Sequence, residues 1–364
     1  MLSNKIYVSY GQDANTMIQE ILSVLQIEQD IPENALIGIK PNLVVAKPST
    51  SGATTSPALV AGIIEYLKSK DRSNIVILES SWIGDRTDRA FSVCGYTELA
   101  DKYQIPLIDL QKDSSTTYRA EDLEIAVCDT VMKLDYLINV PVFKGHCQTK
   151  ITCALKNLKG CIPNSEKRRF HTLGLHKPIA YLNIIITTNL VVVDGMMGDL
   201  TFEEGGNPVQ MDMILVGSDP VLIDSYVAEL MGYDPEEIPY IKIAENAGVG
   251  HCRNAETGII ELHKEHQRPQ NILTTRKVER LAAYIEEHDA CSACYGSLVR
   301  ALARLDEQGM LNLVREKIHI GQGYRGQCGT GIGVGSCTKN FARNIPGCPP
   351  TAKEIIRTLL TINE

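Results

Sequence analysis

Short apolar runs alternate with amphipathic stretches from about residue 5 to residue 247. The runs are mostly continuous in Val, Ile and Leu, which is typical of strands covered on both faces of a sheet. They occupy residues 35–45, 74–79, 105–110, 135–142, 189–194 and 211–216. The stretches between them predict helices at 56–70, 87–103, 177–187, 219–231 and 236–247. This alternation predicts an α/β fold with a mostly parallel or mixed sheet and flanking helices.

Two of these helices have a clear start. Ser56 and Asp219 each precede a proline, so each pairs an N-cap side chain with proline at the first helical position. In a parallel sheet, ligands bind beyond the carboxyl ends of the strands. No Gly-x-Gly-x-x-Gly opens a helix after an early strand, and no Walker-type loop is present. A dinucleotide site is therefore not expected.

The alternation of apolar runs and amphipathic stretches ends after residue 247. We expect an α/β ligand-binding domain at 1–247, a connector at 248–274 and a C-terminal cysteine-rich segment at 275–364. That last segment predicts helices at 278–287 and 351–360, an Ala/Leu/Arg-rich stretch at 295–317 and a glycine-dense loop at 321–335. It reads as a small helical and Gly-rich addition to the main domain.

The net charge and the hydropathy of the chain argue against some classes of function. The net charge is −8 and no Lys/Arg-rich run is present, which argues against nucleic-acid binding. The N-terminus has no apolar signal core, and no stretch is long enough to span a membrane, so we expect a cytoplasmic protein without a membrane partner. Eleven cysteines in that compartment indicate metal ligation or buried thiols rather than disulfides.

The last quarter of the chain carries a cysteine pattern of its own. Cys291 and Cys294 are separated by two residues, Cys337 lies among glycines, and Cys348 is followed by Pro-Pro. A [4Fe–4S] cluster needs four converging thiolates in backbone that lets amides approach the sulfurs. These cysteines are the predicted ligands, and Cys328 is the spare. An exposed cluster would suit an oxygen-poor cell.

Two other interpretations remain. Four thiolates could equally hold zinc, and the cysteines could be independent buried thiols. The glycine-rich approach and the Gly-Cys-Pro-Pro ending favour iron–sulfur.

Cationic residues gather where the predicted strands end. Lys40 and Asn42 lie in an apolar strand, Lys144 and His146 follow the strand that ends at Val142, and the block 155–160 reads Leu-Lys-Asn-Leu-Lys-Gly. A lysine in a buried strand is costly unless it is paired or points into a cleft. We expect the following residues to form a site for a small anion such as a phosphate or carboxylate: Lys40, Asn42, Lys144, Lys156, Asn157 and Lys159. Lys144 and His146 are the candidate catalytic residues, with His146 as proton donor or metal ligand.

Two acidic residues complete the predicted cleft. Asp194 ends an apolar strand, and Glu204 lies in the polar loop that follows. Together they could hold a divalent cation, or instead cap loops through backbone amides. Taken one at a time, the lysines and His146 also have a structural interpretation, as helix-end cations and a hydrogen-bonded scaffold.

These segments together resemble the domain-of-unknown-function 362 family over roughly residues 35–250. The motifs that carry the resemblance are Lys40-Pro-Asn42, Lys144-x-His146, the 155–160 block, Asp194-Gly195 and Gly217-Ser-Asp-Pro220. The resemblance implies an iron–sulfur protein of undefined reaction. The ending Gly-x-Cys…Gly-Cys-Pro-Pro is also similar to the cluster segment of hydrogenase small subunits.

The sequence therefore predicts an iron–sulfur oxidoreductase or electron-transfer module with an anion-binding α/β domain. A ferredoxin- or flavodoxin-type partner would exchange its electrons. The alternatives are a non-redox enzyme acting on a phosphorylated or carboxylated small molecule with a structural metal site, and an accessory protein for assembling a metalloenzyme.

Overall fold

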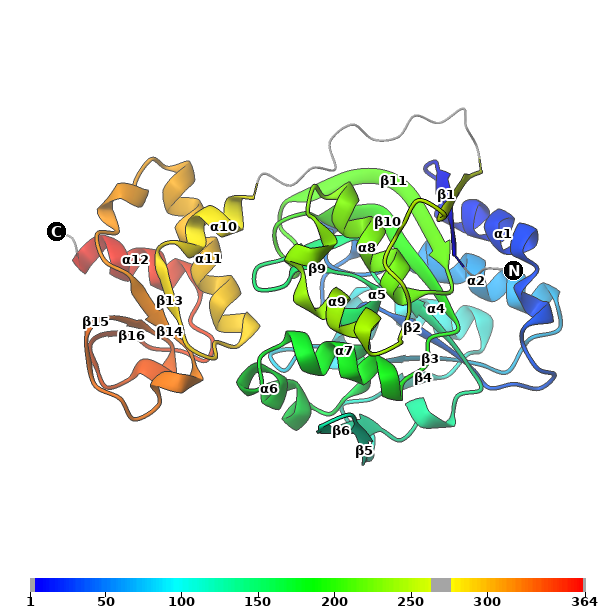
Figure 1. Ribbon diagram of the computed structural model, residues 1–364, viewed down its shortest axis with the longest axis horizontal. Helices are drawn as coiled ribbons and strands as arrows, with labels where there is room; N and C mark the ends of the chain where they lie inside the picture. The colour runs from blue at the N-terminus through cyan, green and yellow to red at the C-terminus, as the bar shows by residue number, and fades with distance from the viewer. Residues whose placement is uncertain (1–3, 263–275, 363–364) are drawn as a thin grey trace. The chain divides into compact units, whose positions relative to one another are not determined.

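The computed structural model describes residues 4–262 and 276–362 (Figure 1). The chain forms two compact units, one from residues 1–167 and 175–273 and the other from residues 168–174 and 274–364. Among the described residues, no helix is long and apolar enough to cross a membrane.

The first unit is built on an eight-stranded mixed sheet. Its strands, in spatial order, are β12 (Gly258–Glu261), β1 (Lys5–Tyr10), β11 (Pro208–Gly217), β10 (Leu190–Asp199), β7 (Tyr136–Val140), β2 (Ile37–Pro41), β3 (Ile75–Glu79) and β4 (Leu107–Asp109). Strands β10, β7, β2, β3 and β4 run parallel, whereas β11 is antiparallel to both β10 and β1. The predicted α/β class with a mixed sheet is confirmed.

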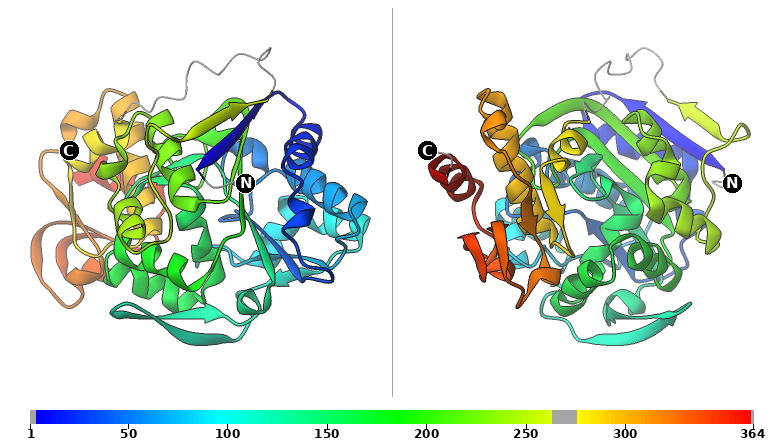
Figure 2. Two further views of the ribbon diagram at one scale, coloured as in Figure 1. Left: turned by 45° about the vertical axis from the view of Figure 1, so that its right-hand side comes forward. Right: turned by 60° about the vertical axis from the view of Figure 1, so that its left-hand side comes forward.

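Helices flank this sheet, as the two views of Figure 2 show. They are α1 (Ala14–Leu25), α2 (Pro57–Ser69), α3 (Thr87–Val93), α4 (Tyr96–Tyr103), α5 (Ala154–Asn157), α7 (His176–Ile185), α8 (Pro220–Leu230) and α9 (Pro239–Asn246). A further helix, α6 (Asn164–Thr172), begins in the first unit and ends in the second. Side chains from α1 and α2 share one core with alternate residues of the central strands, such as Ile37 and Ile39. This alternation follows from the two-residue period of a strand. Helices α5 and α8 contact β7 and β11.

Both predicted helix starts are confirmed. The Ser56 hydroxyl accepts from the Ala58 N–H, and the Asp219 carboxylate accepts from two N–H groups of the first turn of α8. The helix predicted at 87–103 is instead two helices, because Gly95 between them adopts φ +80°. A residue with positive φ does not continue a right-handed helix.

Several short elements were not predicted from the sequence. Besides β1, β12 and α1, these are the hairpins β5 (Ser115–Ala120) with β6 (Leu123–Cys128) and β8 (Lys144–His146) with β9 (Lys150–Thr152). The 3-10 helices are η1 (Ile27–Gln29), η2 (Ser49–Ser51), η3 (Val131–Lys133), η4 (Leu158–Cys161), η5 (Pro235–Glu237), η6 (Leu311–Leu313), η7 (Gln322–Tyr324) and η8 (Ser336–Thr338).

The second unit contains a four-stranded parallel sheet that the sequence did not predict. Its strands are β13 (Ile285–Glu287), β14 (Ile318–Ile320), β15 (Gly329–Val334) and β16 (Phe341–Ile345), and its helices are α10 (Lys277–Ala282), α11 (Ser292–Glu307) and α12 (Ala352–Ile362). The helix predicted at 278–287 is wrong in its second half, which is β13. Ile285 there pairs with Ile318, so a distant strand overrides the local preference for helix.

Candidate functional site

The carboxyl ends of β2, β3, β7 and β10 lie at one edge of the sheet, because these strands are parallel. Lys40 lies near the end of β2, Glu79 ends β3, and the chain continues from β7 into Lys144 and His146 of β8. This arrangement brings the predicted cationic residues to one place.

Lys40 is paired with a carboxylate that the sequence analysis missed. Its Nζ lies 2.9 Å from Glu79 Oε2, and both side chains are buried. The same Nζ donates to the Pro41 carbonyl at 2.7 Å. The Leu43 N–H also donates to Glu79, at 2.8 Å, so the pair is well satisfied. Gly160 packs against it so closely that a Cβ there would lie 1.9 Å from Glu79 Oε1.

Three asparagines form a hydrogen-bonded chain under the site. Asn42 Nδ2 donates to Asn157 Oδ1 at 2.9 Å, and Asn157 Nδ2 donates to Asn139 Oδ1 at 2.7 Å. Asn139 in turn donates to the Ala154 carbonyl at the start of α5. The chain ties β2 and β7 to α5, and it leaves Asn42 Oδ1 to accept from Lys144 at 3.0 Å. Asn42 and Asn157 therefore position the lysines.

Lys144 is fully buried and has three oxygen acceptors. Besides Asn42 Oδ1, its Nζ donates to the Ala53 carbonyl at 2.5 Å and the Glu203 carbonyl at 2.8 Å. Burial lowers the pKa of Lys144 to about 7, and the charge of Lys156 adds to that effect while Glu203 opposes it.

His146, Lys156 and Glu203 form a cluster of their own. Lys156 Nζ lies 2.7 Å from Glu203 Oε2, and His146 Nε2 lies 3.0 Å from the same oxygen, although not aligned as a hydrogen bond. His146 Nδ1 accepts from the backbone N–H groups of Gln148 and Thr149, both at 3.0 Å. The proton of the neutral ring is therefore on Nε2, facing Glu203.

The charges of this cluster follow from its burial. Desolvation lowers the pKa of His146 to about 4, against the opposing effect of Glu203. Burial alone would raise the pKa of Glu203, but His146 and Lys156 outweigh it and hold that pKa well below its usual range. At neutral pH the cluster thus contains a neutral imidazole and a carboxylate. The role of His146 as a proton donor stays a prediction.

Lys159 differs from the other lysines. In the described part of the chain, no hydrogen bond or ion pair engages its ammonium. Burial lowers its pKa to about 7, with Lys156 adding to the shift, and its charge in turn lowers the pKa of His146.

The Asp194 carboxylate accepts from the Ser56 and Met196 N–H groups at 2.6 and 3.0 Å, and burial raises its pKa to about 6. For Asp194 this geometry fits the loop-capping alternative. The Glu204 carbonyl accepts from Lys47. The binding of a divalent cation by Asp194 and Glu204 stays a prediction.

Three further residues of the site were missed from the sequence. Glu79 and Glu203 are the carboxylates that meet the lysines, and Lys167 is buried, donating to the Ser80 and Ser81 carbonyls at 2.7 Å. Glu79 is a charged residue at the end of an apolar strand, and this position in the sequence could have identified it as a site residue. Glu203 neighbours the predicted Glu204 in a loop without periodicity, where the sequence cannot tell which of two glutamates turns inward.

The four predicted cluster cysteines lie in the second unit. Cys291 is the N-cap residue of α11 and Cys294 lies in its first turn. A hydrogen bond from Cys294 lowers the pKa of Cys291 to about 6, and Arg325 contributes. The same bond and burial raise the pKa of Cys294. A helix N-terminus favours thiolates.

Cys337 and Cys348 come to the same place. Their charges act on Cys294, and Arg325 Nε donates to Cys337 Sγ at 3.5 Å. The Ser336 N–H donates to the Gly347 carbonyl at 2.8 Å, which joins the segments before the two cysteines. Cys328 is exposed, and within the described residues no contact links it to the others.

Among the described residues, no group of three or more His, Cys, Asp or Glu side chains is arranged so that it could hold a metal ion. The binding of a [4Fe–4S] cluster by the four cysteines therefore stays a prediction. Of the remaining cysteines, Cys128, Cys153 and Cys161 are buried thiols whose pKa burial raises.

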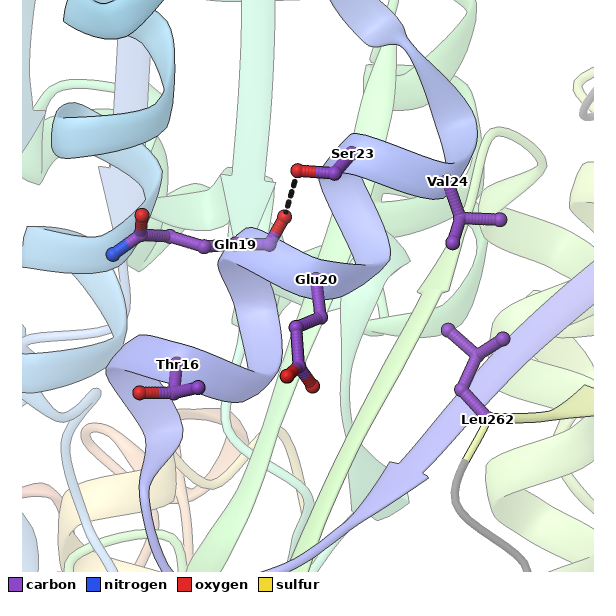
Figure 3. Close-up of a pocket in the computed structure, with 6 residues that line it drawn as sticks. All are labelled: Thr16, Gln19, Glu20, Ser23, Val24 and Leu262. Carbon is purple, nitrogen blue, oxygen red and sulfur yellow. Dashed lines mark hydrogen bonds between the residues drawn. The ribbon is translucent and has the colours of Figure 1, made fainter.

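Two hollows of the first unit lie away from these residues. One, of about 570 Å³, is lined by residues of α1 and by Leu262, and Figure 3 shows Val24 and Leu262 side by side. The other, of about 290 Å³, lies beside Asn183 and the start of α8. None of the predicted site residues lines either hollow.

Two proteins are similar to parts of this chain. The chain is 23% identical over 222 residues to the thylakoid-associated protein sll1697 of Synechocystis, a match that covers 58% of this chain and 67% of the relative. It is also similar to the lactate racemase apoprotein from Thermoanaerobacterium thermosaccharolyticum, with 12% identity and a TM-score of 0.41. That match covers 62% of this chain and only 57% of the racemase.

A family model also matches this chain. The model described as "Domain of unknown function (DUF362)" matches residues 37–229, which is more than half of the chain. This range contains every residue of the lysine site from Lys40 to Glu203. The chain therefore belongs to the DUF362 family.

Proposed function

We propose that this protein is an iron–sulfur redox protein with an anion-binding α/β domain. One [4Fe–4S] cluster would be held by Cys291, Cys294, Cys337 and Cys348. The observation that carries the proposal is that cysteines from three separate segments act on one another electrostatically, since Cys291, Cys337 and Cys348 all affect the pKa of Cys294. Arg325 donates to Cys337 and is also affected by Cys291 and Cys348. Cys328, the spare, does not join them.

The residues present fit such a group. The N-terminus of α11 and the Arg325 guanidinium both favour thiolates. Gly335 lies against Cys294, since a Cβ built there would be 3.6 Å from its Sγ. When bound, the cluster would accept and donate single electrons.

Zinc is the alternative occupant of the same four thiolates. The glycine-rich approach to Cys337 and the Gly-Cys-Pro-Pro ending favour iron–sulfur.

The exposure of the cysteines supports a role in electron exchange. Cys348 is exposed and Cys337 is partly exposed. A cluster near the surface is accessible to a ferredoxin- or flavodoxin-type partner, which we propose as its source or acceptor of electrons. Without a dinucleotide fingerprint in the chain, such a protein partner is a better donor than a nicotinamide.

Metal analysis of the full chain tests the proposal. Protein purified without oxygen should be brown and contain iron and acid-labile sulfide at about four each per chain. Serine at any of the four cysteines should lower the iron content, because an alkoxide is a poor ligand for iron. Cys328→Ser is the matched control and should keep the full content. Stoichiometric zinc without sulfide would overturn the proposal.

A non-redox enzyme is the second candidate, and Lys159 favours it. A partly buried amine whose pKa is about 7 is half neutral at physiological pH, which suits a general base or nucleophile. Such an enzyme would act on a phosphorylated or carboxylated compound, with the cysteines holding a structural metal. Turnover unaffected by loss of iron would favour this candidate.

A further inference from the structure

Glu203 holds the position that a bound anion would take. Its Oε2 lies 2.7 Å from Lys156 Nζ and 3.0 Å from His146 Nε2. Carboxylate and phosphate oxygens of ligands are bound by these same donor groups, an ammonium and an imidazole N–H. The side chain of Glu203 is therefore equivalent to a ligand oxyanion supplied by the protein itself.

The loop that carries Glu203 is fixed by its backbone. The Asp199 carboxylate accepts from the N–H groups of Thr201, Phe202 and Asn207, all within 2.9 Å. The Glu203 carbonyl accepts from Lys144 at 2.8 Å. None of these bonds involves the Glu203 carboxylate, so that carboxylate can leave by rotation of its own side chain while the loop stays in place.

The Glu203 side chain is also more exposed than the two side chains that it contacts. It is 15% exposed, whereas the side chains of His146 and Lys156 are 0% and 6% exposed. The half-buried Lys159 ammonium, which has no hydrogen-bond partner among the described residues, acts electrostatically on the same cluster.

We propose that Lys156 and His146 form an oxyanion subsite that Glu203 occupies in the free protein, and that a small phosphate or carboxylate compound binds by displacing the Glu203 side chain. Lys159 is the second cation for that ligand. The inference rests on the anion-binding part of the proposed function and not on the cluster. It makes Glu203 a built-in competitor that sets the affinity and excludes weak anions.

Calorimetric titration of the full chain with inorganic phosphate tests this inference. A tethered competitor acts at a high effective concentration, so the unmodified protein should bind phosphate weakly. Glu203→Gln keeps the size and the backbone carbonyl but removes the charge, and it should bind phosphate at least ~10-fold more tightly. Glu203→Ala, which removes the competing group altogether, should show the same gain.

Glu33→Gln is the matched control, since it removes the same charge from an exposed position before the amino end of β2, away from the site. It should bind phosphate as the unmodified protein does. Adding Lys156→Met to Glu203→Ala should abolish the gain. A parallel titration with acetate distinguishes a phosphate site from a carboxylate site, because the better ligand gains more from the Glu203 change.

Binding by Glu203→Ala that is equal to or weaker than binding by Glu33→Gln would overturn the inference, because Glu203 would then be part of the site rather than its competitor. Iron content measured on the same samples keeps this outcome separate from the proposed function. If the Glu203 variants lack iron but bind phosphate more tightly, the cluster proposal is contradicted and this inference is supported.

Discussion

His146 shows how surroundings decide the chemistry of a side chain. Its Nδ1 accepts from two backbone N–H groups, an arrangement that only an unprotonated nitrogen can make. Burial adds to this and lowers the pKa of His146 from its usual 6.5 to about 4. The folded protein therefore binds fewer protons than the unfolded chain between these two pH values, and His146 makes it more stable as the pH rises through that window.

We expect the protein to lose stability as the pH falls from about 6.5 to about 4, by up to about 3 kcal/mol from this histidine. His146→Asn keeps an acceptor near Nδ1 but cannot be protonated, so it should flatten this part of the pH profile. Urea unfolding followed by the fluorescence of Trp82, the one tryptophan, measures it. An unchanged slope in the variant would show that the pKa of His146 is not lowered in the folded protein.

Gly160 shows that a glycine can be required by a neighbour rather than by its own φ. A Cβ there would lie 1.9 Å from Glu79 Oε1 and 2.6 Å from Lys40 Nζ. Gly160→Ala should separate the buried ion pair and cost about 3–5 kcal/mol of unfolding free energy. Gly258→Ala is the control, because its Cβ would meet nothing closer than 3.4 Å. Equal stability of the two variants in urea would contradict this account.

At the scale of elements, α5 depends on another helix for its start. Its N-cap residue, Cys153, makes no side-chain cap, and the first N–H groups, of Ala154 and Leu155, donate instead to Asp224 of α8 at 2.7 and 3.2 Å. A helix of four residues cannot hold its shape alone. Asp224 therefore positions the turn that carries Lys156.

Asp224→Asn should weaken phosphate binding several-fold and cost about 1–3 kcal/mol, because an amide can accept through only one of its two terminal atoms. Asp219→Asn is the control: Asp219 also accepts through both oxygens, from the first turn of α8 and from the His251 N–H, so it loses the same kind of bond without touching α5. Calorimetry and urea unfolding of both variants measure the two effects. If both variants bind phosphate alike, Asp224 does not position Lys156.

At the scale of the whole molecule, the two units differ in how they are stabilised. The first has a broad core on an eight-stranded sheet, whereas the second has four short strands. Small units often depend on a metal or a disulfide for stability, and none of the cysteines in the structure forms a disulfide. The proposed cluster would supply that support.

Removing iron with a chelator should therefore increase hydrogen exchange in β13–β16 more than in β2, β3 and β7. Exchange measured by mass spectrometry on the full chain, with and without chelator, gives both values in one experiment. Cys328→Ser protein should respond as the unmodified protein does. Equal changes in both units, or none, would show that the metal does not stabilise the second unit.

The sequence by itself determined the elements whose causes are local. Continuous apolar runs predicted six strands of the main sheet, and the caps at Ser56 and Asp219 predicted two helix starts. The lysines and cysteines stood out because their residue types and spacing carry chemistry. The parallel order of the strands then accounts for the meeting of Lys40 and Lys144 at one edge.

Only the tertiary structure decided what these residues are paired with. Lys40 meets Glu79, Lys156 meets Glu203, and α5 starts on Asp224, across separations of 39, 47 and 70 residues. The strand β13 likewise exists because a distant strand pairs with it. The physical reason is the same in each case: the free energy of a buried charge or an unpaired strand depends on the partner that the fold brings to it, and no local pattern records that partner.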